Sequence, residues 1–227
     1  MVAIAITDLA LIYLIPVAAF IVAWLALALA VYVLVRSPLD FAFKHDLRRK
    51  FEERRKLPSG ARLRLSFPYV AQLLLGDNCI QAAFLYRVSH FFGRRRLHVL
   101  ARAMNSFSKF LTHLDVSPYA EIGPGVVFYH GLGTVIGKGT QIGARALICQ
   151  GVTTGGGPRI GDDVKLWAGA KIIGKVSIGD RAEIGANAVV LEDVPADTVA
   201  VGVPATHLIR EQPELLRESE LGPFVRA

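Results

Sequence analysis

The sequence predicts an α+β protein in which an N-terminal transmembrane helix and a helical cap precede a stacked parallel β-helix. Residues 9–35 carry no charged side chain, and residues 67–114 place apolar side chains at the three- and four-residue spacing of helices. From residue 136 onward, aliphatic residues recur every six positions. We therefore expect five parts: an anchor (1–36), a basic juxtamembrane segment (37–66), a helical domain (67–114), a β-helix (115–205) and a tail (206–227).

The uncharged run is long enough to cross a bilayer. Its 27 residues from Leu9 to Val35 would form a helix of ~40 Å, against a hydrocarbon core of ~30 Å. Tyr13 and Tyr32 lie near its ends, where aromatic side chains suit the membrane interface. A cleaved signal peptide is the alternative, but no basic residue precedes the run and the run is about twice a normal signal core. We expect a single-pass anchor.

The positive charge lies directly after this run. Of the net +7, residues 36–64 carry ten basic and four acidic side chains, whereas the last 112 residues carry ten basic and twelve acidic ones. This distribution excludes a uniformly basic nucleic-acid binder, and by the positive-inside rule it places the C-terminal part in the cytoplasm. Cys79 and Cys149 are the two cysteines, which excludes a disulfide framework and a cysteine-based zinc site.

The basic segment has two open interpretations. In "DFAFKHDLRRKFEERRKL", the apolar Phe41, Leu47 and Phe51 stand among charged residues. The segment is either a helix lying on anionic lipid headgroups or a solvated charged linker.

The period of six predicts a solenoid with one flat strand and one tight corner per repeat. Four residues after each aliphatic position, a second series is small or β-branched, and Gly often follows the aliphatic residue. Thr154 interrupts the first series, and Val116, Ile122 and Phe128 continue it with a shift of two residues that falls around residues 130–133. The aliphatic series is Ile136, Ile142, Ile148, Ile160, Leu166, Ile172, Ile178, Ile184 and Val190.

The order of several motifs resembles a known family. The stretches "LYRVSHFF", "DVSPYAEIGPGVVFYHGLGTVIG", "ICQGVTTGGG", "AGAKIIG" and "GVPA" resemble the serine acetyltransferases and their polysaccharide O-acetyltransferase relatives, within the hexapeptide-repeat acyltransferases. The resemblance implies a left-handed β-helix with eighteen residues per coil, a homotrimer or higher oligomer with sites between subunits, acetyl-CoA as co-substrate and no metal. It also implies a bacterial host, so the anchor would lie in the inner membrane.

The same resemblance assigns a catalytic pair. His130 in "YHGLG" takes the place of the family's catalytic histidine, and Asp115, fifteen residues upstream, that of the carboxylate that orients it. With eighteen residues per coil, we expect the two side chains nearly one above the other on adjacent coils. The imidazole would accept the proton of an acceptor hydroxyl that attacks the thioester directly, and backbone N–H groups of Gly155 to Gly157 would bind the oxyanion. The alternative is that His130 is an ordinary surface residue in a turn.

Small residues would line the groove for coenzyme A (CoA), and nearby cations would contact its phosphates. The resemblance points to Gly156, Ala168, Ala186, Lys171, Arg210 and Pro204 of "GVPA".

The acceptor is predicted from departures from the family pattern. Tyr129 replaces an Asp that helps to hold serine, and the loop before Arg159 lacks the family's Arg and second His, which leaves Arg159 as the nearby cation expected to contact the substrate. Asp77 is the sole candidate for the acid that the family carries in its helical domain, and Trp167 borders the expected site. Because Tyr129 suits stacking on a sugar, we expect an O-acetyltransferase acting on a cell-envelope or exopolysaccharide precursor. The alternatives are serine O-acetylation, which serves cysteine biosynthesis, and a catalytically inactive membrane-anchored scaffold.

Overall fold

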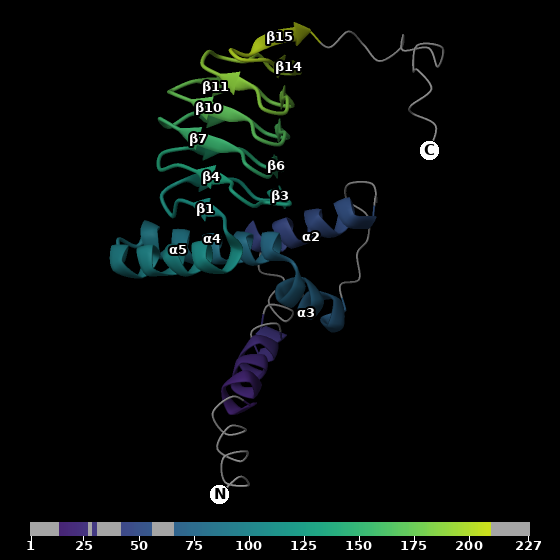
Figure 1. Cartoon of the computed structure of the whole chain (residues 1–227), viewed down its shortest axis with the longest axis vertical. Helices are drawn as coiled ribbons and strands as arrows, with labels where there is room; N and C mark the ends of the chain where they lie inside the picture. Colours follow the sequence, from purple (N-terminus) through teal and green to yellow (C-terminus); the bar gives the residue numbers. More distant parts are fainter. Residues whose placement is uncertain (1–13, 27–28, 31–41, 56–65, 210–227) are drawn as a thin grey trace, which may run out of the picture.

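A computed structural model describes residues 14–26, 29–30, 42–55 and 66–209 of the 227-residue chain. In this part, a stack of β-coils stands on a base of helices, and the coils run away from the base toward the C-terminus (Figure 1). The hydrophobic core is continuous from the base into the stack, because side chains of both share one buried cluster.

The N-terminal part is described only partly. Residues 14–26 and 29–30 are helical with mostly exposed side chains, while Trp24 packs against the core cluster. The rest of the predicted span 9–35, with Tyr13 and Tyr32, lies outside the described residues. Among the residues that are described, no helix is both long and apolar enough to cross a membrane.

The base contains the helices expected between residues 67 and 114, and one more. The carboxylate of Asp77 starts α4 by accepting hydrogen bonds from the backbone N–H groups of Cys79 and Ile80, which satisfies donors that a helix start leaves free. A left-handed residue, His113, ends α5 and leads into the first strand. The four helices are α2 (Ala42–Arg55), α3 (Phe67–Gly76), α4 (Asn78–Arg94) and α5 (His98–Thr112).

The solvated-linker interpretation of the basic segment is wrong for α2, which is a helix that packs on the base, and contact of this helix with lipid headgroups stays a prediction. Phe43, Leu47 and Phe51 recur every four residues and are buried, so α2 docks through an apolar stripe. Asp46 on the same helix is fully buried, paired with Arg87 at 2.8 Å and bonded to the backbone N–H groups at the first coil. Asp46 and Lys50 are buried and have partners, which a count of charged residues in the sequence does not show.

The β-helix has three faces of stacked strands, as the period of six predicts. Sheet A contains β1 (Asp115–Val116), β4 (Val135–Ile136), β7 (Thr153–Gly155), β10 (Lys171–Ile173) and β13 (Val189–Val190). Sheet B contains β2 (Glu121–Ile122), β5 (Gln141–Ile142), β8 (Arg159–Ile160) and β11 (Ser177–Ile178). Sheet C contains β3 (Val127–Tyr129), β6 (Leu147–Cys149), β9 (Lys165–Leu166), β12 (Glu183–Ile184), β14 (Thr198–Val201) and the antiparallel β15 (Thr206–Ile209).

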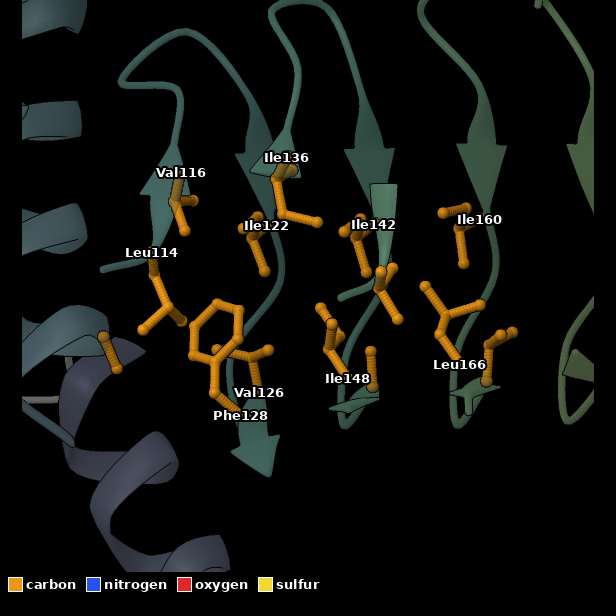
Figure 2. Close-up of a cluster of buried hydrophobic side chains, with 14 of the residues drawn as sticks. Leu114, Val116, Ile122, Val126, Phe128, Ile136, Ile142, Ile148, Ile160 and Leu166 are labelled. Atoms are coloured by element: carbon orange, nitrogen blue, oxygen red, sulfur yellow. The ribbon is translucent and has the colours of Figure 1, made fainter. Parts of the chain in front are cut away.

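Every residue of the aliphatic series is buried. Figure 2 shows five of them, Ile136, Ile142, Ile148, Ile160 and Leu166, pointing into the interior of the coils. Thr154 keeps its inward place because its hydroxyl bonds the hydroxyl of Thr140 at 2.9 Å and accepts the Gly137 N–H at 3.1 Å. Sheet A pairs Thr153 with Lys171, eighteen residues on, but Asp115 with Val135, twenty residues on. The first coil therefore has the two extra residues that the sequence predicts, between β3 and β4.

Candidate active site

His130 stands at the corner where the chain passes from sheet C to sheet A. The extra residues of the first coil lie here, and His130 adopts a left-handed backbone (φ 59°) directly after β3. The turn closes through a 2.7 Å hydrogen bond from the Leu132 N–H to the His130 carbonyl, and the His130 side chain is exposed. The local insertion thus turns the imidazole out of the regular stack and toward solvent.

A cavity of about 290 Å³ opens beside this imidazole, between the corner and the helical base. The Tyr129 ring meets the His130 ring edge-on, with centroids 5.4 Å apart. Behind it, Lys50 of α2 donates to the Phe128 carbonyl at 2.8 Å and lies 5.1 Å from the centre of the Tyr129 ring. The lining residues are Lys50, Arg54, Gly76, Asp77, Asn78, Cys79, Tyr129 and His130.

The expected stacking of Asp115 under His130 is wrong. Asp115 opens the same coil that His130 closes, and its neighbour on the next coil is Val135. Its carboxylate lies 3.3 Å from the Asn105 amide and 3.6 Å from the Lys109 ammonium, in a separate cavity of about 390 Å³ under α5. Across the part of the chain that the structure describes, no hydrogen bond joins it to His130. The role of Asp115 in orienting the imidazole stays a prediction.

Two of the residues predicted to bind CoA lie on the corner that carries His130. Along this corner, backbone hydrogen bonds connect equivalent positions on successive coils: the Gly151 N–H donates to Leu132, the Gly169 N–H to Gln150 and the Asn187 N–H to Ala168. Ala168 is half-buried and Ala186, eighteen residues on, is exposed. We call this column the histidine corner; it consists of residues 130–134, 150–152, 168–170 and 186–188. From residue 168 onward its side chains are small.

The other predicted CoA residues lie elsewhere or have a structural explanation. Gly156 belongs to the corner between sheets A and B, where a Cβ atom would come within 2.8 Å of the Gly174 Cα. The Lys171 ammonium donates to the Gly151 carbonyl at 2.5 Å and to the Thr153 hydroxyl at 3.2 Å, and so braces the histidine corner. Pro204 is exposed between β14 and β15. Arg210 lies outside the described residues.

Two of the three predicted substrate residues do not line the His130 cavity. Arg159 is exposed on sheet B, in a shallow groove of about 990 Å³ that runs along that face. Trp167, directly after β9 of sheet C, is 39% exposed, and its indole N–H lies 3.3 Å from the Glu183 carboxylate. Gly155 to Gly157, predicted as oxyanion donors, also lie away from this cavity, at the end of β7 and in the corner that follows it. Within one chain, only Tyr129 of the predicted substrate residues adjoins the imidazole.

Three cavity residues were missed as a group by sequence reasoning. Lys50 and Arg54 face the cavity from α2, and Asp77 bonds Arg54 at 2.7 Å and lies 3.8 Å from Lys50. The available signal was the four-residue spacing of Asp46, Lys50 and Arg54, which puts them on one helix face. Asp77 is the candidate for the acid of the family's helical domain, but the sequence does not predict that it lies beside Lys50 and Arg54.

The two cysteines are poor nucleophiles in this structure. Burial raises the pKa of the Cys79 thiol to about 11, although Lys50 opposes the shift, and burial also raises the pKa of Cys149. A thiolate is the reactive form, so neither favours a covalent acyl-enzyme. Within the described ranges, no three His, Cys, Asp or Glu side chains gather as a metal site would require.

Comparisons with known proteins place this geometry in a family. The family model for the bacterial transferase hexapeptide (six repeats) matches residues 157–192. A serine acetyltransferase of Helicobacter pylori strain J99 is 40% identical over 141 residues, which cover 59% of this chain and 82% of the relative. The chain belongs to the serine acetyltransferase family of hexapeptide-repeat acyltransferases.

Other serine acetyltransferases agree with this placement. That of Bacillus pumilus is 35% identical over 155 residues, covering 65% of this chain and 71% of the relative. A solved serine acetyltransferase in complex with CoA has a TM-score of 0.66 at 30% identity, covering 74% of this chain and 68% of that one. A soybean serine acetyltransferase complexed with serine has a TM-score of 0.64 at 36% identity, with the same coverage. As a member of the serine acetyltransferase family, the protein is an acyltransferase that uses acetyl-CoA.

Proposed function

We propose that the protein is a serine O-acetyltransferase in which His130 is the general base. The observation that carries the proposal is the exposed imidazole on a corner lined by small residues, in a chain that matches serine acetyltransferases over most of their length. The relatives support serine as the acceptor better than the saccharide that Tyr129 suggested.

The reaction follows from the chemistry of an imidazole at this corner. A neutral His130 accepts the proton of the serine hydroxyl as that oxygen attacks the thioester carbonyl of acetyl-CoA. A new C–O bond forms, the tetrahedral oxyanion collapses, and the C–S bond breaks. The imidazolium returns the proton to the CoA thiolate. Ala168 and Ala186 leave the corner clear for the pantetheine arm to lie along the backbone.

A saccharide acceptor is the second candidate, because two specific departures favour it. Tyr129 adjoins His130, and an aromatic ring offers a stacking surface for a sugar. The stretch "GGGPRIG" also lacks the Arg and second His that the family resemblance leads us to expect for serine. The same His130 chemistry applies to a sugar hydroxyl.

The acceptor is tested by measuring CoA thiol release from acetyl-CoA by the full-length purified protein, with L-serine in one arm and a lipid-linked saccharide extract in the other. We expect release with serine, and loss of that release in His130→Ala. The matched control is His98→Ala, since His98 bonds the Tyr119 hydroxyl at 3.0 Å and does not line the His130 cavity. Release with saccharide alone would replace serine by the second candidate. Silence in both arms would favour an inactive scaffold.

We also propose that residues 1–36 anchor the protein in the bacterial inner membrane, with the β-helix in the cytoplasm. The support is the uncharged run 9–35 followed by ten basic residues within 36–64. The full chain should stay in the membrane pellet after alkaline washing, and a chain lacking residues 1–36 should not. Recovery of the full chain in the wash would contradict the anchor.

A further inference from the structure

The side chains that line the His130 cavity have a net positive charge. Lys50 and Arg54 contribute two positive charges, and Asp77 is the sole carboxylate in the lining, so the lining has a net charge of +1 before His130 is counted. Lys50 is buried, with 8% of its side chain exposed. Burying a cation is costly unless it is paired or hydrogen-bonded.

Both cations have N–H donors that are not used by the hydrogen bonds given above. Arg54 uses one terminal nitrogen, Nη2, for Asp77 at 2.7 Å, and a guanidinium has five N–H donors. Lys50 gives one N–H to the Phe128 carbonyl, and its separation of 3.8 Å from Asp77 is beyond hydrogen-bond length. The Asp77 oxygens are already engaged, Oδ1 by the start of α4 and Oδ2 by Arg54. The cavity therefore offers donors and lacks a free anion.

We infer that Arg54, supported by Lys50, recognises the carboxylate of the acceptor while His130 takes the proton from its hydroxyl. The inference rests on the proposed function and adds the residues that hold the substrate. A carboxylate matches the guanidinium fork of Arg54, and the buried charge of Lys50 strengthens the field at the same place. The two cations of α2 would thereby bind the acceptor carboxylate in place of the Arg–His pair that the Gly-rich loop lacks.

The test compares L-serine with L-serinamide, which keeps the hydroxyl and loses the carboxylate. In the wild type, serine should be the better acceptor. In Arg54→Gln, KM for serine should rise ~10- to 100-fold while KM for serinamide changes little, because a charged hydrogen bond is lost only with the carboxylate. Arg54→Lys should recover part of the loss. The matched control is Arg55→Gln, since Arg55 lies over the Phe51 ring and outside the cavity lining.

The outcomes separate this inference from the proposed function. If the wild type does not acetylate serine, the proposed function falls and the inference falls with it. If the wild type acetylates serine but Arg54→Gln leaves KM unchanged, the inference alone is wrong. An equal rise in KM for serine and serinamide would mean that Arg54 acts only structurally, through its pair with Asp77. That result would also overturn the inference.

A second, independent observation concerns α5, whose amphipathic character is inverted. The residues it buries against the molecule are small or polar: Ala101, Ser108 and Thr112. Its large apolar side chains face outward, and Val99 and Phe110 are each 81% exposed. These two residues are eleven positions apart, about three helical turns, so they share one face.

The surroundings of this outer face favour one kind of partner. Residues 78–114 contain six Lys and Arg and no Asp or Glu. Arg94, Arg96 and Arg102 are exposed around the apolar side chains. Asp115, just after α5, pairs with Lys109 at 3.6 Å, and the exposed arginines outnumber it. Apolar side chains bordered by an excess of cations are the pattern of a helix at an anionic bilayer surface. We propose that the outer face of α5 lies on anionic lipid headgroups, beside the membrane that the N-terminal run would enter.

The test uses a fluorescent label on the full chain reconstituted in vesicles. Both native cysteines are buried, so a thiol label can be directed to Ala103→Cys on the outer face of α5, with Ala196→Cys on the β-helix as control. A lipid-borne quencher should quench the label at 103, not at 196, in vesicles containing phosphatidylglycerol, and much less in pure phosphatidylcholine. Equal quenching in both vesicles, or none, overturns the proposal. Concentration-dependent shielding without lipid would assign the face to a second copy.

Discussion

Two corners of the β-helix have the same left-handed backbone conformation but carry different kinds of side chain. At the corner between sheets B and C, Arg145, Asp163, Arg181 and Asp197 occupy equivalent left-handed positions, with φ between 56° and 58°. Arg145 pairs with Asp163, and Arg181 pairs with Asp197 at 2.6 Å. We call this column the charged corner. At the histidine corner, Gly151, Gly169 and Asn187 adopt the same left-handed backbone with small side chains.

The comparison teaches that stacking does not depend on the corner side chains. In both columns, backbone N–H groups bond the carbonyls of the coil before, as Asp163 does to Ala144 and Asn187 to Ala168, each at 2.8 Å. The side chains are therefore free to specialise. The charged corner ties coils to each other and, through Asp46 at Gly125, to α2. The histidine corner carries the exposed His130 imidazole and the small side chains of Ala168 and Ala186.

The largest difference between the corners should appear in catalysis. His130→Gln removes the base, and kcat/KM should fall ~10²- to 10⁴-fold. The thermal unfolding midpoint should stay within a few degrees of the wild type, because the side chain is exposed. Steady-state kinetics and a melting curve on the same preparation check both. A variant with full activity would remove His130 from the mechanism.

The largest effect on stability should come from the charged corner at its junction with α2. Asp46→Ala leaves Arg87 without its buried partner and frees two backbone N–H groups, so the free energy of unfolding should fall by ~3–5 kcal/mol. Denaturant titration measures it. Glu53→Ala, which removes a partly exposed pair with Arg49 on the same helix, should stay within ~1 kcal/mol. Equal losses in the two variants would show that Asp46 does not fix α2.

A bulky side chain should distinguish the two corners in donor binding. Ala168→Phe on the histidine corner should raise KM for acetyl-CoA ~10-fold, since about 1.4 kcal/mol of binding is lost when the pantetheine arm is displaced. Ala196→Phe, at the exposed position before Asp197 on the charged corner, should leave KM unchanged. Equal rises in both variants would mean that the donor does not follow the histidine corner.

The smallest effect should come from the exposed ion pairs. The hydrogen bond from Arg145 holds the pKa of Asp163 below its usual value, so the pair contributes stability above the unfolded pKa of about 3.9 and loses it as the pH falls toward the lower folded pKa. Asp163→Asn should lower the free energy of unfolding at pH 7 by at most ~1 kcal/mol, because water screens both side chains. Denaturation of both proteins across pH should show the difference shrinking below pH ~3.9. A difference that grows in acid would contradict the sign.

The β-helix was predictable from sequence because its interior repeats a single environment. Ile136, Ile148 and Ile184 each fill the same inward slot, so the period reports the fold directly. Thr154 departs from the aliphatic pattern but is accommodated in the core because its hydroxyl hydrogen-bonds the hydroxyl of Thr140. The insertion near His130 was visible for the same reason, as a shift in an otherwise fixed count.

The site was less predictable because its parts meet only in three dimensions. Asp115 and His130 are fifteen residues apart, and the twenty-residue first coil pairs Asp115 with Val135, five residues beyond His130. Lys50 lies 78 residues from Phe128, whose carbonyl it holds. The charge of α2 suggested solvent or lipid because a composition count does not distinguish a buried, partnered cation from a solvated one.

The two extra residues of the first coil place His130 at one end of the stack, apart from the coils that set its length. Every pairing in sheet A after Val135 keeps the eighteen-residue repeat, so the reactive group sits at one end of a regular polymer. Whole coils can be inserted or removed between β7 and β13 without touching the turn that displays the imidazole. Such edits would change the length of the proposed donor-binding corner alone, so the number of coils and the position of the imidazole are set by different parts of the chain.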